Sequence, residues 1–169
     1  MRRLGAGLRL AAILALPWPV QARAEAPLSL RFVAPERYTD AENRWGSGLS
    51  LRVTLAEVER IFRDLAQRRL PPGDTLAVEV LDIDLAGFER PDAGTGLRIV
   101  NDATPPRFRL RYTLTSRGRR VLAAEETVSD VNFLLRARAL SSASNLAYER
   151  DLLRNWFEDR IVRRQPPPA

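Results

Sequence analysis

The chain has 169 residues and contains no cysteine, histidine or lysine, and its 27 arginines against 21 acidic residues give a formal net charge of +6. These absences exclude disulfides, zinc sites built on imidazole or thiolate, Ser-His-Asp triads, cysteine nucleophiles and lysine Schiff bases. Carboxylates, tyrosine, serine, threonine and arginine are the reactive groups that remain.

The first 24 residues are typical of a secretory signal peptide. Arginines up to Arg9 precede an apolar run over residues 10–16, and Ala22 and Ala24 fit the small residues of a cleavage site. The run is far shorter than the roughly 20 residues of a membrane-spanning helix. An N-terminal membrane anchor is the alternative. We therefore expect a periplasmic or secreted protein with no membrane span after cleavage.

The charge of the remaining chain is close to balanced. Four of the 27 arginines lie within residues 1–24. The rest of the chain therefore contains 23 arginines and 21 acidic residues, and its net charge is +2. This small excess is not the electrostatic footprint of a nucleic-acid-binding protein. The length predicts one α/β domain over residues 25–162, followed by a disordered tail over 163–169.

Residues 28–33 alternate as a short strand, and the polar segment 35–48 reads as a long loop. A helix follows. Thr54, with Glu57 three residues later, has the pattern of a capping box at its first turn. Leu55, Val58, Ile61, Phe62 and Leu65 recur at helical spacing, and Pro71 and Pro72 end the helix.

Residues 75–85 predict a strand whose apolar face changes side. Leu76, Val78 and Val80 occupy even positions, whereas Leu81, Ile83 and Leu85 occupy odd ones. Either the strand is central and buried on both faces at its start, or a β-bulge near residue 80 rotates its second half. Asp82 and Asp84 share one face under both explanations, because strand side chains repeat every two residues.

A second half-buried strand begins at Arg107 and leads into a hairpin. Its inward residues are Phe108, Leu110, Tyr112 and Leu114, after a possible short edge strand at residues 97–100. Residues 116–119 predict the turn, and 121–128 the returning strand. A three-residue loop places Glu125 opposite Arg111, whereas a two-residue loop would bury Glu125. We therefore expect the longer loop.

The last third of the chain is mostly helical. Residues 131–140 favour a short helix, residues 141–144 offer an N-cap, and an amphipathic helix covers about 145–162. The order β-α-β-(β)-β-β-α predicts an α/β sandwich with a small mixed sheet of four to five strands. The first two strands should be parallel, with the helices packed on one face.

Several segments together resemble a known family. "RFVAPERYTDA", "LPPGDTLAVEVLDIDLAG", "PPRFRLRYTL", "EETVSDVNFL" and "YERDLLRNWF" occur in this order. Together they are similar to the domain of unknown function 3016 family, small exported bacterial proteins, over about residues 30–157. The resemblance implies an exported protein of uncharacterised function and assigns no catalytic residue.

Asp82 and Asp84 are the first candidate site. Two carboxylates on one strand face could bind Ca²⁺ or Mg²⁺, or act as an acid–base pair with separated pKa values. The structural interpretation is that they accept backbone N–H groups at a strand end, or pair with arginines of a neighbouring strand. We favour the structural interpretation and assign no catalytic, cofactor-binding or metal-ligating residue.

Arg107, Arg109 and Arg111 are the second candidate, a basic row on one strand face. They could bind phosphate or carboxylate groups of an envelope polymer, or simply pair with Glu125 and other acids. We expect a binding or accessory module of the cell envelope whose partner is an envelope protein or an anionic polymer. The alternative is a carboxylate- or metal-dependent hydrolase that acts outside the cytoplasm.

Overall fold

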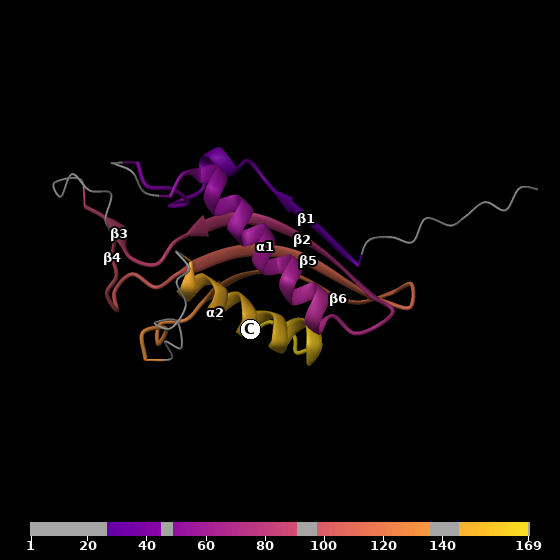
Figure 1. The fold of residues 1–169 in the computed structure, drawn as a ribbon. Helices are drawn as coiled ribbons and strands as arrows, with labels where there is room; N and C mark the ends of the chain where they lie inside the picture. Colours follow the sequence, from indigo (N-terminus) through magenta and orange to yellow (C-terminus); the bar gives the residue numbers. More distant parts are fainter. Residues whose placement is uncertain (1–26, 45–48, 91–97, 136–145, 169) are drawn as a thin grey trace, which may run out of the picture.

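The computed structural model describes residues 27–44, 49–90, 98–135 and 146–168. A four-stranded mixed sheet forms one layer and two helices form the other (Figure 1). The sheet contains, in spatial order, β1 (Leu28–Phe32), β2 (Asp74–Asp84), β5 (Arg107–Ser116) and β6 (Arg119–Ser129). β1 is parallel to β2, and the other neighbours are antiparallel. The expected fold class is confirmed.

The remaining elements lie around this sheet. α1 (Leu51–Arg69) connects β1 to β2, and α2 (Ala147–Trp156) continues directly into a π-helical segment, η4 (Phe157–Val162). A single 3₁₀ turn, η1 (Pro35–Arg37), follows β1. The short strands β3 (Phe88–Glu89) and β4 (Arg98–Ile99) pair with each other, so the expected edge strand near residue 98 belongs to a separate small sheet.

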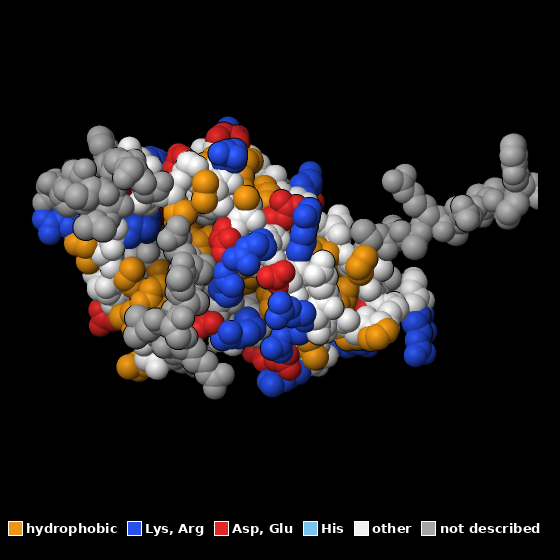
Figure 2. Space-filling model, viewed as in Figure 1, with side chains coloured by type: hydrophobic (Ala, Val, Ile, Leu, Met, Phe, Trp, Pro, Cys, Tyr) orange, Lys and Arg blue, Asp and Glu red, His pale blue; other side chains and the backbone are white. Residues whose placement is uncertain are grey.

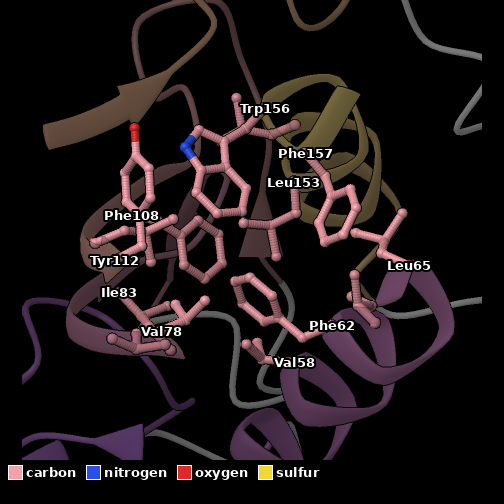
Figure 3. Close-up of a cluster of buried hydrophobic side chains, with 14 of the residues drawn as sticks. Val58, Phe62, Leu65, Val78, Ile83, Phe108, Tyr112, Leu153, Trp156 and Phe157 are labelled. Carbon is pink, nitrogen blue, oxygen red and sulfur yellow. The ribbon is translucent and has the colours of Figure 1, made fainter. Parts of the chain in front are cut away.

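The core lies between the helices and one face of the sheet. Figure 3 shows Val58, Phe62 and Leu65 of α1 facing side chains of the sheet and of the C-terminal helix. Trp156 stands edge-on to Tyr112, with ring centroids 5.1 Å apart, and edge-on to Phe62 at 6.0 Å. Such edge-to-face contacts add about 0.5–1.5 kcal/mol beyond the burial of area.

α1 begins one turn earlier than the sequence indicated. Ser50 is the N-cap, and its Oγ accepts the amide of Val53 at 3.4 Å, while the Glu42 carboxylate accepts the amide of Leu51 at 3.3 Å. Thr54 lies inside the helix, is fully buried, and its hydroxyl has no hydrogen-bond partner. The capping box at Thr54 is therefore wrong, because a carboxylate from the preceding loop and Ser50 satisfy the first amides instead.

β2 contains the β-bulge that the change of apolar face suggested. Val80 lies opposite Leu110, but Asp82 lies opposite Arg109, so Leu81 is an extra residue in the ladder. Before the bulge the even positions face the helices, and after it Ile83 does. Of the two explanations, the bulge is confirmed.

The β5–β6 hairpin combines a short turn with a second bulge. Arg117 and Gly118 form a two-residue turn with φ of 49° and 76°. Positive φ at both central residues is the geometry that connects twisted antiparallel strands most directly. A register shift after Leu114 then leaves Val121 as an extra residue, and Arg111 lies opposite Glu125. The expected three-residue loop is wrong, but the expected strand alignment is confirmed, because the bulge supplies the third residue.

Some expectations fall outside the described residues: the leader at 1–24, the N-cap at 141–144 and most of the short helix at 131–140. The described residues 131–135 form turns. Within the described part of the chain, no helix combines the length and apolarity that a membrane span requires.

Two substitutions distinguish the observed start of α1 from a start at Thr54. Ser50→Ala should lower the free energy of unfolding by about 1 kcal/mol, because it removes the N-cap oxygen. Thr54→Val should leave it unchanged or raise it, because it replaces an unsatisfied buried hydroxyl by a methyl group of similar shape. Urea unfolding of both variants measures this; a larger loss for Thr54→Val than for Ser50→Ala would contradict the assignment.

Candidate functional site

The face of the sheet opposite the helices carries a row of charged side chains. Arg31 of β1, Glu79 of β2, Arg111 and Arg109 of β5 and Glu125 of β6 all project from this open face. The arginine side chains are more exposed than the acids: 66% for Arg31 and 53% for Arg111, against 27% for Glu79. The alternation of each strand and the cross-strand register bring these residues together on one surface.

Each glutamate of this row is shared by two arginines. Glu79 accepts from Arg31 and from Nη1 of Arg111 at 2.8 Å. Glu125 accepts from Nε of Arg109 at 2.9 Å and from Nη2 of Arg111 at 2.8 Å. We call these five residues the charge ladder. The arginine hydrogen bonds lower the pKa of both glutamates, so the ladder stays ionised and has one more positive than negative charge.

Asp82 holds the loop that follows β1. Its two carboxylate oxygens accept the amide and the hydroxyl of Thr39, both at 2.7 Å, and one of them also accepts the amide of Ile83 at 2.9 Å. The parallel bridge between Asp40 and Asp84 places the same loop beside the end of β2. Asp82 therefore acts as a local clamp between loop and strand.

Asp84 lies beside Asp82 on the open face but has a different environment. Burial raises its pKa, and the Arg107 guanidinium, 3.3 Å away, opposes this effect. Among the residues that the structure describes, no group of three or more carboxylates is arranged to hold a metal ion. The five sequence candidates thus share one face, where Asp84 pairs with Arg107, and Arg109 and Arg111 belong to the charge ladder.

A partly buried polar cluster at the end of β2 was not expected from the sequence. Arg98 of β4 donates to the Asp40 carboxylate, with Nη2 2.6 Å from Oδ2, and to the carbonyl oxygen of Gly87 at 2.9 Å. Gly87 has φ of 78°, and a Cβ there would lie 2.3 Å from the carbonyl oxygen of Ile99. A glycine is thus required where β3 and β4 meet the main sheet.

Glu149 of α2 joins the same region from the helix layer. Only 2% of its surface is exposed, and its carboxylate accepts the amide of Ala86 at 2.8 Å. Burial raises the pKa of Glu149. The cluster connects the loop after β1, the end of β2, β4 and α2. No local sequence pattern predicts it, because Arg98 and Asp40 are 58 residues apart in the chain.

A second polar cluster ties the hairpin to the C-terminal helix. Glu126 of β6 faces the helices and accepts from the Tyr112 hydroxyl at 2.7 Å, from Trp156 Nε1 at 3.0 Å and from Arg160 Nε at 3.0 Å. No pattern in the sequence indicated that Glu126 would be the polar partner of Trp156. These contacts fix the position of α2 over the sheet.

Three hollows along the described residues lie away from the two aspartates. A hollow of about 370 Å³ lies beside α2 and η4, lined among others by Asp130, Phe133 and Tyr148, and it includes neither Asp82 nor Asp84. An enzyme that used the two aspartates would need them at the floor of a concave site. Asp82 is instead engaged by the hydroxyl and amide contacts described above, and the charge ladder lies on the open face of the sheet.

The family model described as "Protein of unknown function (DUF3016)" matches residues 26–159. The chain belongs to this family. The match includes every element of the sheet and all residues of the charge ladder, and it confirms the resemblance found in the sequence segments. Comparison with curated proteins and with solved structures finds no match.

The buried carboxyl of Glu149 leads to a prediction about pH. Its raised pKa means that the folded state binds the proton more tightly than the unfolded state. The stability that it contributes is therefore complete at acid pH and is lost as the pH rises through the folded pKa. Glu149→Gln should unfold at a higher denaturant concentration than the wild type at neutral pH, and the difference should close on acidification. A less stable variant at neutral pH would show that the charge on Glu149 is stabilising.

Proposed function

We propose that the protein is an exported binding module of the cell envelope, and that its open sheet face binds a partner carrying carboxylate or phosphate groups. The arrangement of Arg31, Arg109 and Arg111 carries this proposal. Three exposed guanidinium groups are held in fixed relative positions by two shared glutamates. Guanidinium groups bind carboxylate and phosphate in bidentate geometry.

The shared glutamates support binding by ordering the arginines in advance. A free arginine side chain loses rotamer freedom when it binds an anion, and a side chain already held by neighbours loses less. Glu125 contacts Arg109 and Arg111 together, so the two guanidinium groups stay side by side. Their remaining N–H groups can face an anionic partner without a large rearrangement.

The ladder is hard to explain as a device for stability alone. Exposed ion pairs contribute about 0–1 kcal/mol each, and salt screens them. The open face nevertheless has four such ion pairs, which together extend across all four strands of the sheet. A hydrolase that used Asp82 is less well supported, because Asp82 already accepts hydrogen bonds from Thr39 and Ile83.

Binding of simple polyanions tests the proposal. Poly-glutamate supplies carboxylates and inorganic polyphosphate supplies phosphates, and isothermal titration measures the dissociation constant of each. Arg111→Gln should weaken binding about tenfold or more, because a charge-assisted hydrogen bond contributes roughly 1.5–3 kcal/mol. Added salt should weaken wild-type binding steeply.

Arg60→Gln is the matched control. Arg60 lies on α1, in the helix layer, is about as exposed as Arg111 at 51% and also pairs with acids. Figure 2 shows that the helix side of the molecule carries intermixed basic and acidic side chains. Arg60→Gln should leave binding unchanged. An equal loss for the two variants, or no binding of either polyanion by the wild type, would contradict the proposal.

Export has a separate test. Cleavage after Ala24 would leave Glu25 as the first residue, because Ala22 and Ala24 fit the small-residue positions of the site. N-terminal sequencing of the protein from fractionated cells identifies the first residue. Recovery of the chain with Met1 intact would contradict export as a cleaved soluble protein.

A further inference from the structure

β1 forms one edge of the sheet (Figure 1). The backbone hydrogen-bonding groups of every second residue of β1 point away from β2. The Pro27 carbonyl accepts the amide of Leu76 at 2.8 Å, and the Val33 amide donates to the Val80 carbonyl at 3.0 Å. Odd-numbered residues of β1 therefore face β2, and the N–H and C=O groups of the even-numbered residues 28, 30 and 32 face outward. Among the described residues, no backbone hydrogen bond reaches these outward groups.

A groove of about 440 Å³ runs along this edge. Leu28 and Leu30 of β1 line one side, and Glu59, Arg63 and Ala66 of α1 line the other. The leucines pack against the core but are only partly buried. The edge therefore offers unpaired backbone groups next to incompletely covered apolar side chains, which is the combination that an added β-strand satisfies.

The β1 edge is complementary to itself. An antiparallel copy centred on Leu30 places Leu28 of each chain opposite Phe32 of the other, and Leu30 opposite Leu30. All of these residues have outward N–H and C=O groups, so each pair can exchange hydrogen bonds. On the open face, Ser29 lies opposite Arg31 of the other copy, so no like charges lie directly opposite each other.

Two oppositely charged side chains of α1 lie beside the groove. Glu59 and Arg63 form an ion pair within α1, and their side chains are 41% and 65% exposed. A two-fold axis through paired β1 edges would place the α1 helices of the two copies on the same side of the joined sheet, in antiparallel orientation.

The opposite edge of the sheet differs in its first residues, although from Val121 onward β6 alternates exposed and half-buried residues as regularly as β1 does. β6 begins with Arg119 and Arg120 and has a bulge at Val121. Charged residues and bulges are the usual means by which proteins prevent pairing at an exposed edge. β1 has no register shift in its pairing with β2 and alternates half-buried and exposed residues regularly.

We propose that two copies of this chain associate through their β1 edges, which gives one continuous sheet of eight strands with all helices on one side. The inference is independent of the proposed anion binding. In this dimer, strand pairing and ion pairs between Glu59 of each copy and Arg63 of the other would hold the two copies together. Their two charge ladders then lie side by side on one extended face.

Charge reversal and mixing test this arrangement in the purified full chain. Sedimentation equilibrium over a wide range of concentrations should give a dimer for the wild type. Glu59→Arg places a guanidinium against Arg63 of the other copy, and Arg63→Glu places a carboxylate against Glu59. Each variant alone should self-associate at least about tenfold more weakly, because like charges across an interface are costly.

An equimolar mixture of Glu59→Arg and Arg63→Glu should recover the dimer. In the mixed dimer, the two guanidinium groups of one copy, at positions 59 and 63, face the two carboxylates of the other, at positions 63 and 59. A merely damaged fold would not be rescued by mixing, so this result separates a lost interface from a lost fold.

Asp64→Arg is the control for the charge change itself. Asp64 belongs to the same helix, is 44% exposed and pairs with Arg60 outside the groove, so the dimer of this variant should be unchanged. A monomeric wild type at all concentrations, failure of the mixture to associate, or equal weakening by Asp64→Arg would overturn the proposal.

Discussion

The bulge at Leu81 in β2 is the constraint on which the arrangement of the molecule depends. β2 pairs with both β1 and β5, so a change in its register affects the whole sheet. Without the extra residue, the alternation that buries the even positions up to Val80 would turn Asp82 and Asp84 toward the helices. Burial of two unpaired carboxylates would cost far more than a lost apolar contact. The bulge keeps Ile83 in the core and both aspartates on the open face.

Once the bulge has set which residues of the sheet face the helices, burial of apolar side chains and exposure of charged ones determine what lies on each face. The inward face is apolar and packs against α1 and α2, and the polar contacts of Glu149 and Glu126 connect α2 and η4 to the strands and to the end of β2. The outward face has alternating arginine and glutamate across the four strands. Because such exposed pairs contribute little to stability, we interpret the ladder as a surface that presents fixed guanidinium groups. In the proposed dimer, pairing of the β1 edges would place two such surfaces next to each other.

The features that depend on local periodicity could be predicted from the sequence. The face change in β2 and the position of Glu125 opposite Arg111 follow from the spacing of apolar residues, and the parallel β1–β2 pair follows from the β-α-β order of the elements. The predicted start of α1 was wrong because Glu42, from the preceding loop, and Ser50 supply the capping oxygens. The predicted hairpin loop was wrong because a short turn plus a bulge gives the same alignment as a longer loop. The two partly buried polar clusters could not be predicted, since they join residues far apart in the chain that no local pattern relates.

The register of β2 against β5 is the most direct test of this account, because the faces, the clamp at Asp82 and the charge ladder all depend on it. Cross-strand backbone contacts measured by nuclear magnetic resonance report this register residue by residue. The account predicts that Val80 contacts Leu110 and that Asp82 contacts Arg109, with Leu81 unpaired. Contacts of Leu81 with Arg109 and of Asp82 with Phe108 would show an unbroken ladder and would contradict it.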